Sequence, residues 1–204
     1  MGIKTKHILL ICTAFLLLYT PTLAQNLTNK NIPDEVALAA AKALSFYPEL
    51  DNYQIDFVFK KSLNNRVMQA QPKFKTLLAN KQNRQYRIMM SKNLLMKDTT
   101  MILDQLPFDI LVGWFAHELG HIMDYKERSS INLVRFGFNY LTSTPFLKRS
   151  ERKADAYAVK HGLGDQLIKT KNYILHKSNF TTAYKAKIEE LYPSPEDITA
   201  WAEE

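Results

Sequence analysis

The stretch FDILVGWFAHELGHIMDYKE (108–127) places two histidines inside an otherwise apolar segment. His117 and His121 are four residues apart, so on a helix they lie on one face with Cβ atoms about 5–6 Å apart. Imidazoles on successive turns can bind one metal ion together. Gly120 lies between them and is costly inside a helix, which predicts that another element packs closely at this point.

Glu118 follows His117 and is rotated from it by about 100° around the helix. That rotation brings its carboxylate within reach of a water molecule bound to the metal. Zinc lowers the pKa of such a water towards ~7. Glu118 would then take the proton and pass it to a leaving amine. The alternative interpretation is an ordinary helix whose histidines bind buried polar groups.

A catalytic zinc site needs a third protein ligand and one open position. Glu127 is six residues beyond His121, but MDYKE reads as continued helix, so the chain does not turn back there. His161 and His176 lie on later predicted helices. Glu151, in SERKADAYA, is the favoured candidate.

Glu151 is favoured because Asp155 follows it by four residues on the same helix face. Asp155 can accept the free ring N–H of His117 or His121 and fix the orientation of that ring. Ala158 and Gly162 continue this face. We expect such small residues to let the second helix approach the first closely.

H-E-x-x-H followed by E-x-x-x-D resembles the gluzincin signature. HELGH with ERKAD more narrowly resembles the HtpX-like and CAAX-prenyl-protease group of zinc metallopeptidases, and YPSPEDI (192–198) is similar to its H-P-S-P-E-E-R-I segment. The resemblance covers roughly residues 85 to 200. It implies one zinc ion per chain with protein or peptide as substrate. The residue roles that it implies are zinc ligation by His117, His121 and Glu151, general base for Glu118, and an outer partner of a ligand for Asp155.

The resemblance also implies a zincin-like α+β fold, in which a substrate adds as a strand to the sheet edge near QYRIMMS (85–91). The chain departs from the group at Tyr192, where histidine is frequent. The arginine that follows in the group's motif is also missing, as are the membrane-spanning helices of many members.

The pattern of the whole chain predicts the α+β class, with a small sheet and a mostly helical C-terminal half. Alternating residues predict strands at 53–61 and 85–91, with 66–74 as the partner of the first and a turn at Asn64–Asn65. The predicted helices are 33–46, one opened by Pro107, 146–162, 165–177, 181–191 and a last short helix capped by Ser194. Residues 92–104 remain unassigned, and 131–141 are strongly apolar but ambiguous.

Residues 1–24 read as a signal peptide. Lys4 and Lys6 precede an apolar run from Ile8 to Tyr19, which at about 18 Å is too short to span a bilayer of roughly 30 Å. We therefore expect an exported chain, periplasmic or secreted, with one metallopeptidase domain at 25–204. Cys12 is the only cysteine. The mature chain would then have neither disulfides nor thiolate ligands.

The formal net charge of +7 favours anionic partners. The densest basic cluster, within 148–153, is more simply a solvated helix face, and the absence of a nucleic-acid-binding motif predicts no nucleic-acid partner. Residues 131–141 suggest peripheral membrane contact, against the alternatives of core packing or a substrate groove. Besides a zinc endopeptidase, the sequence is therefore compatible with a catalytically silent, chaperone-like zinc module or a membrane-surface binder.

Overall fold

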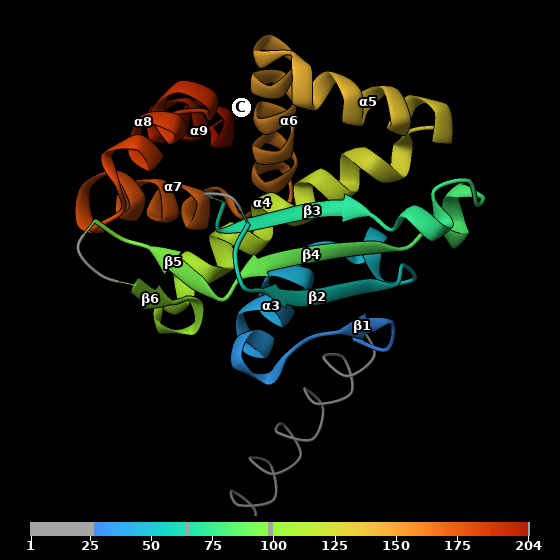
Figure 1. Ribbon diagram of the computed structural model, residues 1–204, viewed down its shortest axis with the longest axis horizontal. Helices are drawn as coiled ribbons and strands as arrows, with labels where there is room; N and C mark the ends of the chain where they lie inside the picture. The colour runs from blue at the N-terminus through green and yellow to red at the C-terminus, as the bar shows by residue number, and fades with distance from the viewer. Residues whose placement is uncertain (1–26, 64–65, 98–99, 204) are drawn as a thin grey trace, which may run out of the picture.

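A computed structural model describes residues 27–63, 66–97 and 100–203 (Figure 1). The chain is α+β, with a small mixed sheet followed by a mostly helical C-terminal half, and this confirms the predicted class. The expected signal peptide at 1–24 and the turn at Asn64–Asn65 lie outside the described residues.

The main sheet has four strands in the order β1-β2-β4-β3. Their bounds are β1 (Lys30–Asn31), β2 (Ile55–Lys60), β3 (Met68–Pro72) and β4 (Tyr86–Ser91). β2 is parallel to β1 and to β4, whereas β3 is antiparallel to β4. Residues 92–104, which the sequence left unassigned, contain a separate antiparallel pair, β5 (Asn93–Leu95) and β6 (Thr100–Ile102).

Two expectations about the sheet were wrong. The 66–74 strand does not pair with 53–61, because β4 lies between β2 and β3. The 85–91 segment is consequently an interior strand, and the edge on this side is β3. The residues explain the order: Tyr86, Ile88 and Met90 of β4 are buried, while β3 ends in Pro72, which has no N–H to donate and suits an edge.

The helices are α3 (Ala37–Leu44), α4 (Phe108–Glu127), α5 (Ser130–Thr142), α6 (Thr144–Lys160), α7 (Gly164–Asn172), α8 (Thr182–Leu191) and α9 (Pro195–Ala202). They confirm the predicted helices with small shifts at their ends, and the ambiguous 131–141 segment is helical. The Ser194 cap is present, with the Asp197 side chain accepting from the Ser194 N–H in return. In the described part of the chain, no helix combines the length and apolarity needed to cross a membrane.

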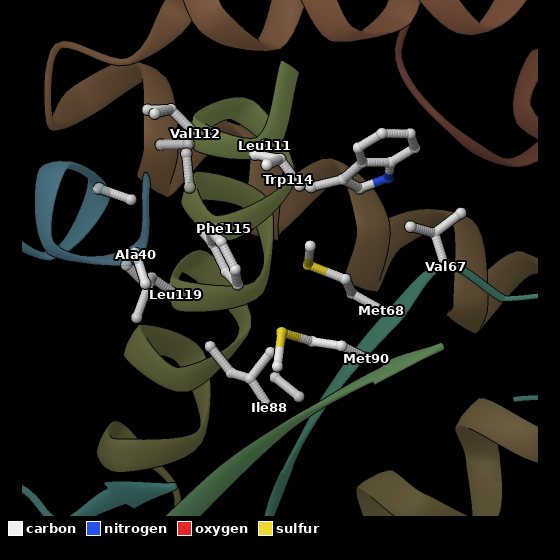
Figure 2. Packing of buried hydrophobic residues seen from close by; sticks show 14 of the residues in the cluster. Ala40, Val67, Met68, Ile88, Met90, Leu111, Val112, Trp114, Phe115 and Leu119 are labelled. Atoms are coloured by element: carbon white, nitrogen blue, oxygen red, sulfur yellow. The ribbon is translucent and has the colours of Figure 1, made fainter. Parts of the chain in front are cut away.

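α4 is the central helix of the domain and passes behind β3 and β4 in Figure 1. Figure 2 shows Met68, Ile88 and Met90 pointing from the strands towards Phe115 of α4. On its other sides α4 packs against α3, α6 and α7, so every residue from Ile110 to Tyr125 is buried. The polar residues within this span must therefore find partners inside the protein.

Candidate metal centre

α4 and α6 bring His117, His121 and Glu151 together in the interior. One potential ligand atom from each residue lies within 4.8 Å of the other two, and all three residues are buried. Glu151 Oε2 is 3.0 Å from His117 Nε2 and 3.3 Å from His121 Nε2. The structure therefore contains a buried group that could hold a metal ion, made of the three residues that the sequence predicted.

The donor set fits a tetrahedral divalent ion. Ligand atoms at roughly 2.0–2.1 Å from a tetrahedral ion are separated by about 3.3 Å, close to the separations between Glu151 Oε2 and the two ring nitrogens. Two imidazole nitrogens and one carboxylate oxygen suit zinc, and three protein ligands leave one position open. Burial alone would raise the pKa of Glu151, but the histidines hold it well below its usual value, so the carboxylate is charged.

Gly120 sets the distance between the two helices. A Cβ atom at this position would lie 2.2 Å from the backbone oxygen of Ala154, so only glycine allows α6 to approach this closely. This is the close packing that Gly120 predicted. Its partner is Ala154, however, and Gly162 does not contribute as expected: it follows α6 with φ +78°, where it ends the helix.

His117 is oriented by a second residue of α6. Its Nδ1 lies 2.7 Å from Asp155 Oδ1, which leaves Nε2 facing Glu151. Burial lowers the pKa of His117, but the carboxylates of Asp155 and Glu151 outweigh it and raise the pKa to about 10. The contact has the form predicted for Asp155, and such partners fix the ring of a ligating histidine.

Lys171 of α7 completes this chain of contacts, although no sequence motif marks it as a site residue. Its Nζ lies 2.9 Å from Asp155 Oδ2, and both side chains are buried. Burial would raise the pKa of Asp155, yet Lys171 and then His117 lower it. Asp155 is therefore an ionised carboxylate held between a lysine and a histidine.

Two tyrosines near the candidate metal ligands were also missed as site residues. Tyr140 of α5 donates a hydrogen bond of 2.5 Å to Glu151 Oε1, the oxygen that faces away from the histidines. Tyr192, which the sequence identified only as a departure from the family pattern, has its ring 5.5 Å from that of His117. Burial, followed by the charge of Glu151, raises the pKa of both phenols, so both stay neutral.

Glu118 connects α4 to the edge strand. Its Oε2 accepts a 2.5 Å hydrogen bond from the backbone N–H of Ala70 in β3. Burial raises the pKa of Glu118 above its usual value, although the two histidines act in the opposite direction. A carboxylate with a raised pKa is a stronger base, which suits proton abstraction near neutral pH.

A cleft of about 550 Å³ opens beside these residues. One wall is β3 with the following Phe74 and Leu77, and the other wall is α5. The lining includes His117, Glu118, His121, Glu151, Tyr140 and Tyr192. The candidate metal ligands are therefore reachable from outside along the edge of the sheet.

The other candidates for a third ligand lie elsewhere. Glu127 is at the exposed end of α4 and pairs with Lys126. His161 lies at the C-terminal end of α6, stacks on Tyr47 at 4.4 Å and faces Glu49 at 3.2 Å. His176 is exposed in the π-helical turn after α7 (Tyr173–Lys177). None of them belongs to the buried group.

Comparisons of this chain with family models, with curated proteins and with solved structures found no match. The resemblance to gluzincins consequently rests on short sequence motifs. The features that point to a function are the buried group on α4 and α6, its outer partners and the cleft that reaches it.

Proposed function

We propose that this chain is a zinc metalloendopeptidase with a zincin-like domain and one zinc ion per chain. The observation that carries the proposal is the buried group of His117, His121 and Glu151, with Glu118 beside it at the base of an open cleft. Export to the periplasm or the exterior, inferred from residues 1–24, is part of the same proposal.

His117, His121 and Glu151 would hold the zinc ion. When bound, zinc supplies a Lewis acid that polarises a carbonyl and makes water more acidic. Asp155 keeps the Nε2 of His117 directed at the site, and Tyr140 holds Glu151 through its other oxygen. These contacts fix the ligands before a substrate arrives, so that little reorganisation is needed during the reaction.

Glu118 would act as the general base. Its carboxylate takes a proton from the water whose oxygen attacks the scissile carbonyl carbon. It then gives this proton to the amide nitrogen as the C–N bond breaks, so that a carboxylate and an amine leave. The cleft that exposes Glu118 also exposes both histidines, as this sequence of steps requires.

The edge of β3 offers a place for an extended substrate. Val67 and Lys73 use their backbone groups for hydrogen bonds to the segment that contains β4. Backbone groups in an antiparallel pair alternate between the two sides of a strand, so Ala70, opposite Ile88, directs its N–H and C=O away from β4. Ala70 uses its outward groups for Glu118 and Tyr125. The outward groups of Met68 and Pro72 flank it and would pair with the substrate backbone.

The main rival is a catalytically silent, chaperone-like zinc module. In that function the Glu118 carboxylate would serve only to bind the backbone N–H of Ala70. Glu118→Gln separates the two functions, because glutamine can still accept from the Ala70 N–H. We expect about 10²–10⁴-fold slower cleavage of an unfolded protein such as casein, with zinc content unchanged.

Glu127→Gln is the matched control, since Glu127 is exposed on the same helix and should leave cleavage unchanged. Stoichiometric zinc with no cleavage by the wild type would support the silent module. Equal cleavage by wild type and Glu118→Gln would rule out Glu118 as the base.

A further inference from the structure

α5 has one apolar face turned outwards. Ile131, Val134, Phe138 and Leu141 recur at helical spacing, and their exposed fractions run from 58% to 84%. Leu133 and Phe136, on the opposite face, are buried. The interior therefore needs only one side of this helix, and the four outward side chains are unexplained by folding.

Phe74 and Leu78, which follow β3, are each 86% exposed. Phe74 lines the cleft opposite Val134, Phe138 and Leu141, so both walls of the cleft carry apolar side chains at its mouth. We call Phe74, Leu78, Ile131, Val134, Phe138 and Leu141 the apolar rim. Six of the nine large apolar side chains most exposed among the described residues belong to it, which is clustering and not ordinary scatter.

The segments that carry the rim contain no acidic residue. Residues 57–97 contain ten lysines and arginines and no Asp or Glu. Residues 128–150 contain four lysines and arginines and likewise no Asp or Glu. Lys75 and Arg135 are exposed and directly follow the rim residues Phe74 and Val134. The apolar rim therefore lies in segments whose charged side chains are all basic.

We propose that the apolar rim docks on the surface of an anionic phospholipid bilayer. Apolar side chains beside basic ones suit such a surface, because the former enter the acyl boundary while the latter approach the lipid phosphates. A second copy of this chain would bring the same positive charge to the interface and is disfavoured. The inference goes beyond the proposed peptidase activity and does not depend on it.

Docking through the rim would turn the mouth of the cleft towards the lipid. Both walls of the cleft carry rim residues, while the candidate metal ligands, which also line it, are buried on α4 and α6. Polypeptide segments held at a membrane surface would then be the substrates nearest to the site.

Vesicle co-sedimentation tests the docking. We would use residues 25–204, because the apolar run at 8–19 would itself bind lipid. We expect binding to phosphatidylcholine vesicles that contain phosphatidylserine, much weaker binding to phosphatidylcholine alone, and loss in high salt. Absence of binding to the anionic vesicles at low salt would overturn the proposal.

Two pairs of variants sharpen the test. Ile131→Ser/Phe138→Ser should weaken binding roughly tenfold or more, whereas Leu38→Ser, at an 81% exposed position outside the rim, should not. Lys75→Glu/Arg135→Glu should weaken it by about tenfold or more, and Lys160→Glu/Lys177→Glu clearly less. If a rim variant and its control reduced vesicle binding equally, docking through the rim would be contradicted.

Two further readouts exclude other occupants. Light scattering without lipid would show a dimer, lost in Ile131→Ser/Phe138→Ser, if a second copy covered the rim. If that variant slowed cleavage of soluble apolar peptides but bound vesicles normally, the rim would be a substrate groove. Either result overturns the proposal. Glu151→Ala should bind vesicles like the wild type, so failure of the metal site and failure of docking are distinguishable.

Discussion

The Tyr140 hydroxyl donates to Oε1 of Glu151 over 2.5 Å, while Oε2 of the same carboxylate faces His117 and His121. The two oxygens of Glu151 thus have separate tasks. Tyr140 comes from α5, an element that carries none of the three candidate metal ligands, so α5 supports the buried group from outside it.

Removing this hydroxyl should weaken the metal site without unfolding the domain. We expect Tyr140→Phe to reduce zinc affinity by about 10–100-fold, because Glu151 loses the partner that orients it. Titration against a competing chelator measures the change. Tyr157→Phe alters a partly buried tyrosine on α6 and is the control. Equal affinities in all three proteins would show that Tyr140 does not support Glu151.

The buried pair of Lys171 and Asp155 should be strongly coupled. Lys171→Met would leave the Asp155 carboxylate without its cation and should cost about 3–5 kcal/mol of unfolding free energy. Lys171→Met/Asp155→Asn removes both charges and should recover part of that loss. Urea unfolding with chelator present measures both variants. A double variant no more stable than Lys171→Met alone would mean that the pair is not coupled.

Glycine at position 120 should be required for the contact between α4 and α6, although glycine itself disfavours a helix. Alanine favours a helix by about 1 kcal/mol, yet at Gly120 its Cβ would collide with Ala154 and push α6 away. We expect Gly120→Ala to be destabilised and to lose zinc. Gly137→Ala, on α5 with no atom within 4 Å of the added carbon, should instead gain up to about 1 kcal/mol. Thermal unfolding and metal analysis of both variants decide the matter.

Alkaline stability should depend on Tyr86. Burial raises the pKa of this phenol from 10.0 to about 12, although Arg84 opposes the shift. The phenol of Tyr86 thus holds its proton more tightly in the folded protein than in the unfolded chain. Its contribution to the free energy of unfolding is therefore complete below pH 10 and is lost as pH rises towards 12. Between pH 9 and pH 11 the free energy of unfolding should fall by about 1.4 kcal/mol more in the wild type than in Tyr86→Phe. Identical pH dependence in urea unfolding would refute this.

The sequence was most informative where the relevant geometry is local. Helical spacing alone brought His117 onto the same face as His121, and Glu151 onto the same face as Asp155. Gly120 indicated close packing because a mid-helix glycine is otherwise costly. These are relations within one helix, or between one helix and an obvious neighbour, so periodicity was enough to predict them.

What the sequence could not predict depends on tertiary placement. The order of β2, β4 and β3 follows from pairing between distant segments, which the residue pattern within one segment does not encode. Lys171 and Tyr140 reach the site from α7 and α5, whose positions no local pattern specifies. The 131–141 segment was ambiguous because α5 has apolar residues on both faces, one buried and one exposed, which hides the helical period.

The first measurement should be the zinc content of residues 25–204, comparing the wild type with Glu151→Ala. Elemental analysis after purification with added zinc should give one zinc per wild-type chain and little or none in the variant, with Glu127→Ala as a control that keeps its zinc. Stoichiometric zinc in both the wild type and Glu151→Ala would show that Glu151 is not the third ligand. No zinc in the wild type would contradict the metal centre itself.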